Sequence, residues 1–110
     1  MLKETVSQYA RVFDSRCLYW TDDRDYNKML VKHIEVECNT LLVSKGYLFL
    51  RDVYEKLGFE ITKESCFAGW VFNEANNDNF VDLKIKDDAG SNIIIDFNVN
   101  NENIIDLIFN

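Results

Sequence analysis

The hydrophobic period of this 110-residue chain changes near Gly69, and this change limits the folds open to it. Before Gly69, apolar residues recur at helical spacing, and after it they alternate with polar residues as in half-buried strands. Helices followed by consecutive strands are typical of an α+β domain, because each layer buries the apolar face of the other. We therefore predict a single domain over residues 1–110, with a helical part over about 1–58 and an antiparallel sheet over about 69–110.

Three helices are expected in the first part. Residues 3–13 carry apolar side chains at helical spacing and predict an N-terminal helix. A second helix should begin in the acidic segment 21–25, which can cap it, and run to about Lys45. Apolar residues cover much of this helix and include a second stripe, which predicts packing between two partners; the stripe is Met29, Val36 and Val43. Residues 47–57 complete a helical hairpin, and a glycine follows each of its helices.

The second part predicts strands joined by short turns, which form an antiparallel meander of three or four strands. The helical hairpin should cover its apolar face, so the predicted architecture has two layers. The expected strands are 69–72, 80–86, 93–100 and 104–109, with turns at 76–79, 87–91 and 101–103.

Three aspartates fall on the outward face of this predicted meander. A hairpin centred on Ala89 would place Asp82 opposite Asp96, and one centred on Asn101 would place Asp96 opposite Asp106. Such a row could hold a divalent cation or face a basic partner. Opposed like charges cost roughly 0.2–1 kcal/mol per pair. The alternative is therefore a register offset by two residues, in which the acids are separated on a solvated face.

Two further groups of residues are candidates for a partner-binding surface. Apolar residues on the same outward face can mark an interface, unless the N-terminal helix covers them as a third layer. An acidic and aromatic segment lies at 19–23, where capping and core packing are the alternative explanation. The candidates are Trp70, Phe72, Ile94, Ile104 and Ile108 on the sheet, Trp20, Asp22 and Asp23 before the long helix, and Asp87 and Asp88 in the hairpin turn.

No pattern predicts a metal centre, a cofactor or catalytic residues. The cysteines Cys17, Cys38 and Cys66 are widely spaced without a CxxC, which favours reduced thiols in a cytoplasmic protein. His33 is the only histidine and has the spacing of a helix-packing or helix-edge residue. GxSxG, P-loop, GxGxxG and HExxH motifs are absent, so we do not expect an enzyme.

The net charge of −7 is concentrated at one end of the sequence. Residues 1–73 contain 11 acidic and 10 basic residues, whereas residues 74–110 contain 8 acidic and 2 basic ones. This balance argues against direct binding to nucleic-acid phosphates or to anionic lipid. No stretch approaches the ~20 apolar residues of a membrane span, and the N-terminus lacks the apolar core of a signal peptide. We therefore expect a protein partner with a basic surface.

Several short strings in the middle of the chain resemble a family of small proteins of unknown function from bacteriophages and mobile elements of low-GC Gram-positive bacteria. The resemblance covers roughly residues 38–100 and implies action inside a bacterial cell, but no catalytic residues. The strings are Gly46-Tyr47-Leu48-Phe49-Leu50, Asp52-Val53-Tyr54-Glu55, Leu57-Gly58, Gly69-Trp70-Val71-Phe72, Asp78-Asn79-Phe80-Val81-Asp82 and Ile95-Asp96-Phe97-Asn98-Val99.

Charge and resemblance together lead to one main functional hypothesis and two alternatives. The main hypothesis is an anti-CRISPR-type inhibitor, monomeric or homodimeric, that masks the basic nucleic-acid-binding surface of a host defence nucleoprotein such as a CRISPR-associated nuclease. The first alternative is a phage assembly protein that self-associates through its last strand, which carries Ile105 and Phe109. The second is a small metal-dependent hydrolase or nuclease that uses the aspartate row.

Overall fold

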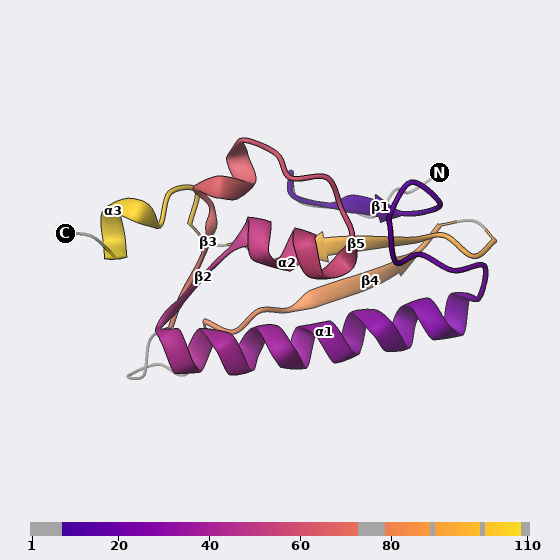
Figure 1. The fold of residues 1–110 in the computed structure, drawn as a ribbon, viewed down its shortest axis with the longest axis horizontal. Coiled ribbons are helices and arrows are strands. Elements are labelled where there is room, and N and C mark those ends of the chain that lie inside the picture. The colour runs from indigo at the N-terminus through magenta and orange to yellow at the C-terminus, as the bar shows by residue number, and fades with distance from the viewer. Residues whose placement is uncertain (1–7, 73–78, 89, 100, 109–110) are drawn as a thin grey trace, which may run out of the picture.

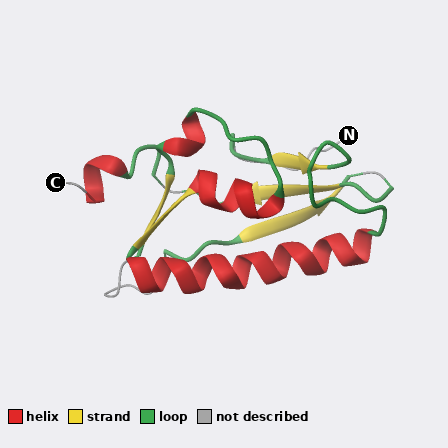
Figure 2. Cartoon of the chain, in the orientation of Figure 1, coloured by secondary structure: helices red, strands yellow, loops and turns green. Residues whose placement is uncertain are grey.

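The computed structural model describes residues 8–72, 79–88, 90–99 and 101–108. It confirms the α+β class: a helical hairpin packs on an antiparallel sheet, with the longest helix along one side of the molecule (Figures 1 and 2). The elements are β1 (Arg11–Phe13), α1 (Arg24–Lys45), β2 (Tyr47–Phe49), α2 (Leu50–Leu57), a 3-10 helix (Glu64–Cys66), β3 (Gly69–Val71), β4 (Leu83–Asp87), β5 (Ile93–Phe97) and α3 (Ile105–Ile108).

Helix α1 begins and ends where its capping residues predict. The Asp23 side chain accepts a hydrogen bond from the backbone N–H of Tyr26 at 3.1 Å, and Gly46 ends the helix in the left-handed conformation with a φ of 88°. One face is buried against the sheet and α2, and it carries Val31, Ile34, Cys38 and Leu42. The Lys56 ammonium of α2 donates to Glu37 Oε1 at 3.1 Å and lowers the pKa of that carboxyl.

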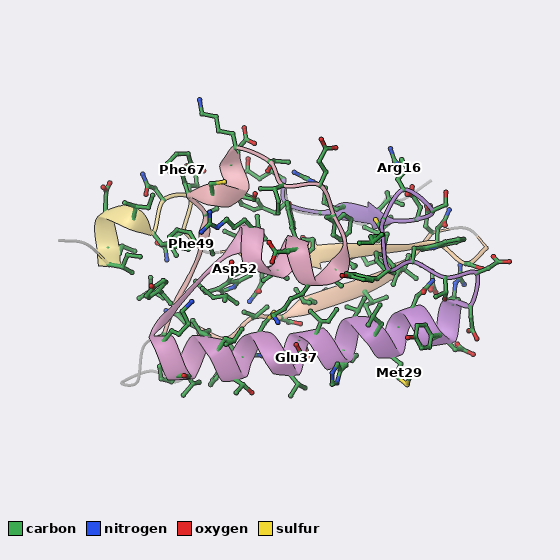
Figure 3. All side chains as sticks on the ribbon, in the orientation of Figure 1. Arg16, Met29, Glu37, Phe49, Asp52 and Phe67 are labelled. Carbon is green, nitrogen blue, oxygen red and sulfur yellow. The ribbon has the colours of Figure 1, made fainter. Side chains whose placement is uncertain are left out.

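The second apolar stripe of α1 is not buried, which corrects the prediction of a helix between two partners. Met29, Val36 and Val43 have exposed fractions of 60%, 65% and 50%. Figure 3 shows Met29 on the side of α1 away from the sheet. The sheet and α2 occupy a single arc of the helix, and the described residues provide no second layer beneath it.

The predicted N-terminal helix is wrong over its described part. Residues 3–7 lie outside the described residues, and residues 8–13 form a turn followed by β1. This strand pairs antiparallel with β5, with Arg11 opposite Ile95 and Phe13 opposite Ile93. Helical spacing cannot reveal a strand partner that lies about eighty residues away, and pairing with that partner overrides a weak local preference.

The predicted helix over 47–57 is also shorter than expected, because its first three residues form β2. The left-handed Gly46 turns the chain sharply, and Tyr47, Leu48 and Phe49 then pair antiparallel with β3. Aromatic and branched side chains favour this extended conformation. β3 therefore belongs to a separate two-stranded sheet, whereas the larger sheet has the order β1-β5-β4. The first half of the chain thus contributes two strands as well as the helices.

Strands β4 and β5 form the predicted hairpin with the predicted inward face. Leu83 pairs with Phe97 and Ile85 with Ile95, and this face packs into the core. Among the described residues, no helix covers the opposite face of the sheet, where Val12 and Ile94 are partly buried and Lys84 is exposed.

The last predicted strand, 104–109, is not formed within its described residues. Residues Ile105–Ile108 form the short helix α3 instead, while Phe109 lies outside the described residues. Ile104, predicted to face outward, is fully buried, and Leu107, which strict alternation would place on the inward face, is 55% exposed. Alternation over six residues is too short a pattern to separate a strand from a helical turn.

Candidate functional site

The predicted aspartate row does not exist, because the β4–β5 register is offset by two residues from the one that would align it. Asp96 lies opposite Lys84, and the backbone N–H of Asp82 donates to Asn98 Oδ1 at 2.7 Å. Asp106 lies on α3, outside the sheet. An opposed Lys–Asp pair is favourable where two opposed carboxylates would repel. The metal-site hypothesis that required the row therefore loses its basis.

Trp70 is also not an exposed contact residue. Its side chain is fully buried, and its indole N–H donates to Asn98 Oδ1 at 3.0 Å. Asn98 in turn donates to the carbonyl oxygen of Phe80 at 2.9 Å, so one asparagine side chain satisfies three polar groups. The prediction placed Trp70 on the outward face of the meander. It failed because β3, which carries Trp70, pairs with β2 in a separate sheet.

Five other carboxylates gather at one end of the molecule, which we name the acidic tip. They come from two segments far apart in sequence: one leads into α1, and the other ends β4. The Ser91 hydroxyl, just after the β4–β5 turn, lies 2.9 Å from both the carbonyl oxygen and Oδ1 of Asp22. The acidic tip consists of Asp22, Asp23, Asp25, Asp87 and Asp88, and all five side chains are exposed.

Asn27 holds the two segments of the acidic tip together. Its side chain is fully buried, and its Oδ1 accepts from the backbone N–H of Thr21 at 3.0 Å and from the Thr21 hydroxyl at 2.8 Å. Its Nδ2 donates to the carbonyl oxygens of Thr21 at 2.8 Å and of Ser91 at 3.3 Å. No sequence motif marks this asparagine, since a single Asn in the first turn of a helix resembles any other.

The acidic tip is only partly neutralised by nearby cations. Asp87 Oδ1 lies 3.2 Å from Lys28 Nζ and 3.7 Å from Arg24 Nη1. Exposed ion pairs of this kind contribute little to stability. The five carboxylates outnumber Arg24, Lys28 and Lys86, the cations on or next to the two segments, so a local excess of negative charge remains. This excess can attract a basic partner over roughly the 8–10 Å of a Debye length.

Exposed apolar side chains flank the first segment of the acidic tip in the sequence. Leu18 and Tyr19 precede it with exposed fractions of 76% and 48%, and Tyr26 and Met29 follow on the first turns of α1 with 44% and 60%. Trp20 is half-buried against the core, and its indole N–H has no hydrogen-bond partner in the described structure. We name Leu18, Tyr19, Tyr26 and Met29 the apolar rim. Apolar groups beside charges of one sign are a common composition of protein interfaces.

The described ranges hold no group of three His, Cys, Asp or Glu side chains able to bind a metal ion. His33 lies on the surface of α1, where its Nε2 is 2.8 Å from Glu37 Oε2. Burial raises the pKa of the Cys38 thiol to about 12. Within the same ranges, no helix has the length and apolarity needed to cross a membrane.

Comparison with models of known protein families assigns this chain to a family. The model of a family described as "Family of unknown function (DUF6353)" matches residues 1–108. The chain belongs to this family. The match extends to both ends of the chain, beyond the segment 38–100 that carries the sequence resemblance, and it confirms membership of a family without an assigned activity. No curated protein and no solved structure matches the chain.

Proposed function

We propose that this protein is a small protein-binding module that docks on a basic surface of its partner through the acidic tip and the apolar rim. The observation that carries the proposal is the meeting of five exposed carboxylates from two distant segments, with four exposed apolar side chains close to one of those segments in the sequence. Carboxylates steer association with a basic surface, and apolar contacts at the same site slow dissociation.

The partner that best fits this surface is a nucleoprotein of bacterial defence, such as a CRISPR-associated nuclease. In such a partner the basic groove normally receives nucleic-acid phosphates, and the carboxylates of the acidic tip would take their place. This proposal includes a phage or mobile-element origin and action in the bacterial cytoplasm.

The experiment is a phage-plating assay on a host that carries an active CRISPR system and expresses this protein. The tip variant changes Asp22, Asp23, Asp87 and Asp88 together to Asn, which preserves the hydrogen-bond acceptors of the Asp23 cap and of Asp22. We expect wild-type protein to restore plating and the tip variant to lose this effect.

The matched control makes the same change in net charge, from −7 to −3, away from the acidic tip. It combines Glu55→Gln, Glu60→Gln, Asp82→Asn and Glu102→Gln, all at exposed positions. This control should retain full inhibition. Full inhibition by the tip variant would refute docking through the acidic tip, and unaltered defence in the presence of wild-type protein would refute the choice of partner.

A second candidate function, self-association in phage assembly, draws support from α1 instead of from the last strand. The exposed stripe of Met29, Val36 and Val43 repeats every seven residues, as in helices that pair with one another. Light scattering at micromolar concentration tests it: a dimer that Val36→Glu converts to a monomer would favour assembly. A wild-type monomer would exclude it.

A further inference from the structure

Two hollows meet beside β1 at the side chains of Arg11, Tyr54 and Thr62. One has a volume of about 440 Å³ and extends toward Arg16 and Phe59, and the other has about 630 Å³ and extends toward Phe67. Both volumes fall within the range of small-molecule sites. We name the pair the Arg11–Tyr54 groove. It lies on elements that do not form the acidic tip: the edge strand β1, helix α2 and the segment that follows α2.

Tyr54 presents an unpartnered polar atom where the hollows meet. Its side chain has no exposed surface, and its ring packs against Phe59 at 5.5 Å and Phe97 at 5.2 Å between centroids. The hydroxyl is buried and has no hydrogen-bond partner in the described structure. Because a buried hydroxyl without a partner is unfavourable, its position at the wall of a hollow points to a ligand that accepts a hydrogen bond there.

Arg11 supplies a cation at the same point. Its guanidinium carbon lies 5.7 Å from the centroid of the Tyr54 ring, and its Nη1 donates to the carbonyl oxygens of Gln8 and Ala10. No carboxylate in the described part of the chain forms an ion pair with it. The neighbouring Arg16 is different, since its Nη2 lies 2.8 Å from Asp14 Oδ2. Arg11 therefore has donor capacity left for an anion.

The surroundings limit the charge and shape of that anion. Glu60 borders one hollow, while Glu64 and Glu102 border the other, so a dianion such as phosphate would be repelled. A guanidinium binds a single carboxylate in a bidentate arrangement. The aromatic side chains Phe59 and Phe67 provide apolar walls on the two sides, and Figure 3 shows Phe67 beside the 3-10 helix.

We propose that the Arg11–Tyr54 groove binds a small monocarboxylate with an aromatic body. The carboxylate lies between the Arg11 guanidinium and the Tyr54 hydroxyl, and the body of the ligand packs against Phe59 or Phe67. This site is independent of the acidic tip, so its ligand can regulate or accompany partner binding without competing for the same residues.

The test is a titration of the full-length protein with benzoate, followed by the NMR signals of Tyr54, Thr62 and Phe59. Benzoate should bind, and neutral benzamide and inorganic phosphate should bind at least tenfold more weakly. Tyr54→Phe removes only the hydroxyl and should weaken benzoate binding about tenfold. Arg11→Gln should abolish benzoate binding. Arg11→Lys, which keeps the positive charge but cannot bind a carboxylate in a bidentate arrangement, should weaken benzoate binding.

The matched control is Arg16→Gln, which removes a cation from the same hollow that is already paired with Asp14. It should bind benzoate as wild type does. The proposal is overturned if benzoate leaves the three signals unchanged, or if phosphate or benzamide binds as tightly. It is equally overturned if Arg16→Gln weakens binding as much as Arg11→Gln does in variants that retain the wild-type amide spectrum.

Discussion

Replacing Asn27 by Ala tests how the acidic tip is held together. The change deletes three hydrogen bonds of 2.8–3.0 Å and a longer one of 3.3 Å from a side chain with no exposed surface. Each buried hydrogen bond contributes about 1 kcal/mol net, and the abandoned groups of Thr21 and Ser91 keep part of their desolvation cost. We expect the free energy of unfolding to fall by roughly 2–4 kcal/mol.

Urea denaturation followed by circular dichroism measures this loss, and thermal unfolding should show a midpoint lower by roughly 10–20 °C. The control is Thr40→Ala, an exposed position on the same helix, which should change stability by no more than about 0.5 kcal/mol. A loss below about 1 kcal/mol for Asn27→Ala would refute the role of Asn27 as a buried connector. The variant should also weaken partner binding, because the β4–β5 turn is no longer held to the start of α1.

Three further predictions concern backbone strain and the thiols. Gly58 and Gly46 have similar φ values of 84° and 88°, but a Cβ at Gly58 would lie 2.8 Å from the backbone nitrogen of Leu18, whereas one at Gly46 meets nothing within 4 Å. Gly46→Ala should therefore cost about 1–2 kcal/mol and Gly58→Ala about 1–3 kcal/mol more in urea denaturation, and equal losses would contradict the clash. Because burial raises the pKa of Cys38 from 9.0 to about 12, the folded state keeps a proton that the unfolded state loses. The free energy of unfolding should consequently fall as pH rises from 9 toward 12, and it should fall less in Cys38→Ala. Urea denaturation at a series of pH values measures this, and the same dependence of the free energy of unfolding on pH in both proteins would contradict the prediction. A thiol reagent should label the partly exposed Cys66 well before Cys38 in native protein, and mass spectrometry follows the two reactions. Labelling of both cysteines at the same rate would contradict the burial of Cys38.

Features that depend on neighbouring residues were predictable from the sequence. The ends of α1 follow from the Asp23 cap and from Gly46, whose positive φ stops a helix at small cost. The inward faces of β4 and β5 follow from alternation, because successive side chains in a strand point to opposite sides. The individual carboxylates of the acidic tip, Asp25 apart, were recognised from local charge in the same way.

Alternation determines which face a residue occupies but not its partner across the sheet. Every even shift of register preserves the faces, so alternation alone could not choose between Asp82 and Lys84 as the neighbour of Asp96. The folded hairpin selects Lys84, which pairs opposite charges. Strand β1 shows the same limit, since its partner β5 lies about eighty residues along the chain and leaves no local signal near Arg11.

The sequence by itself therefore determined the class of fold, the long capped helix, the inward faces of the hairpin and the sign of the charge, because each depends on local spacing or composition. Only the tertiary structure decided which charges meet. It brought Asp22 and Asp87 to one end through Asn27 and Ser91, separated Asp82 from Asp96, and placed Arg11 over Tyr54. These encounters join residues from distant segments, and their geometry is set by core packing, which no short pattern in the chain records.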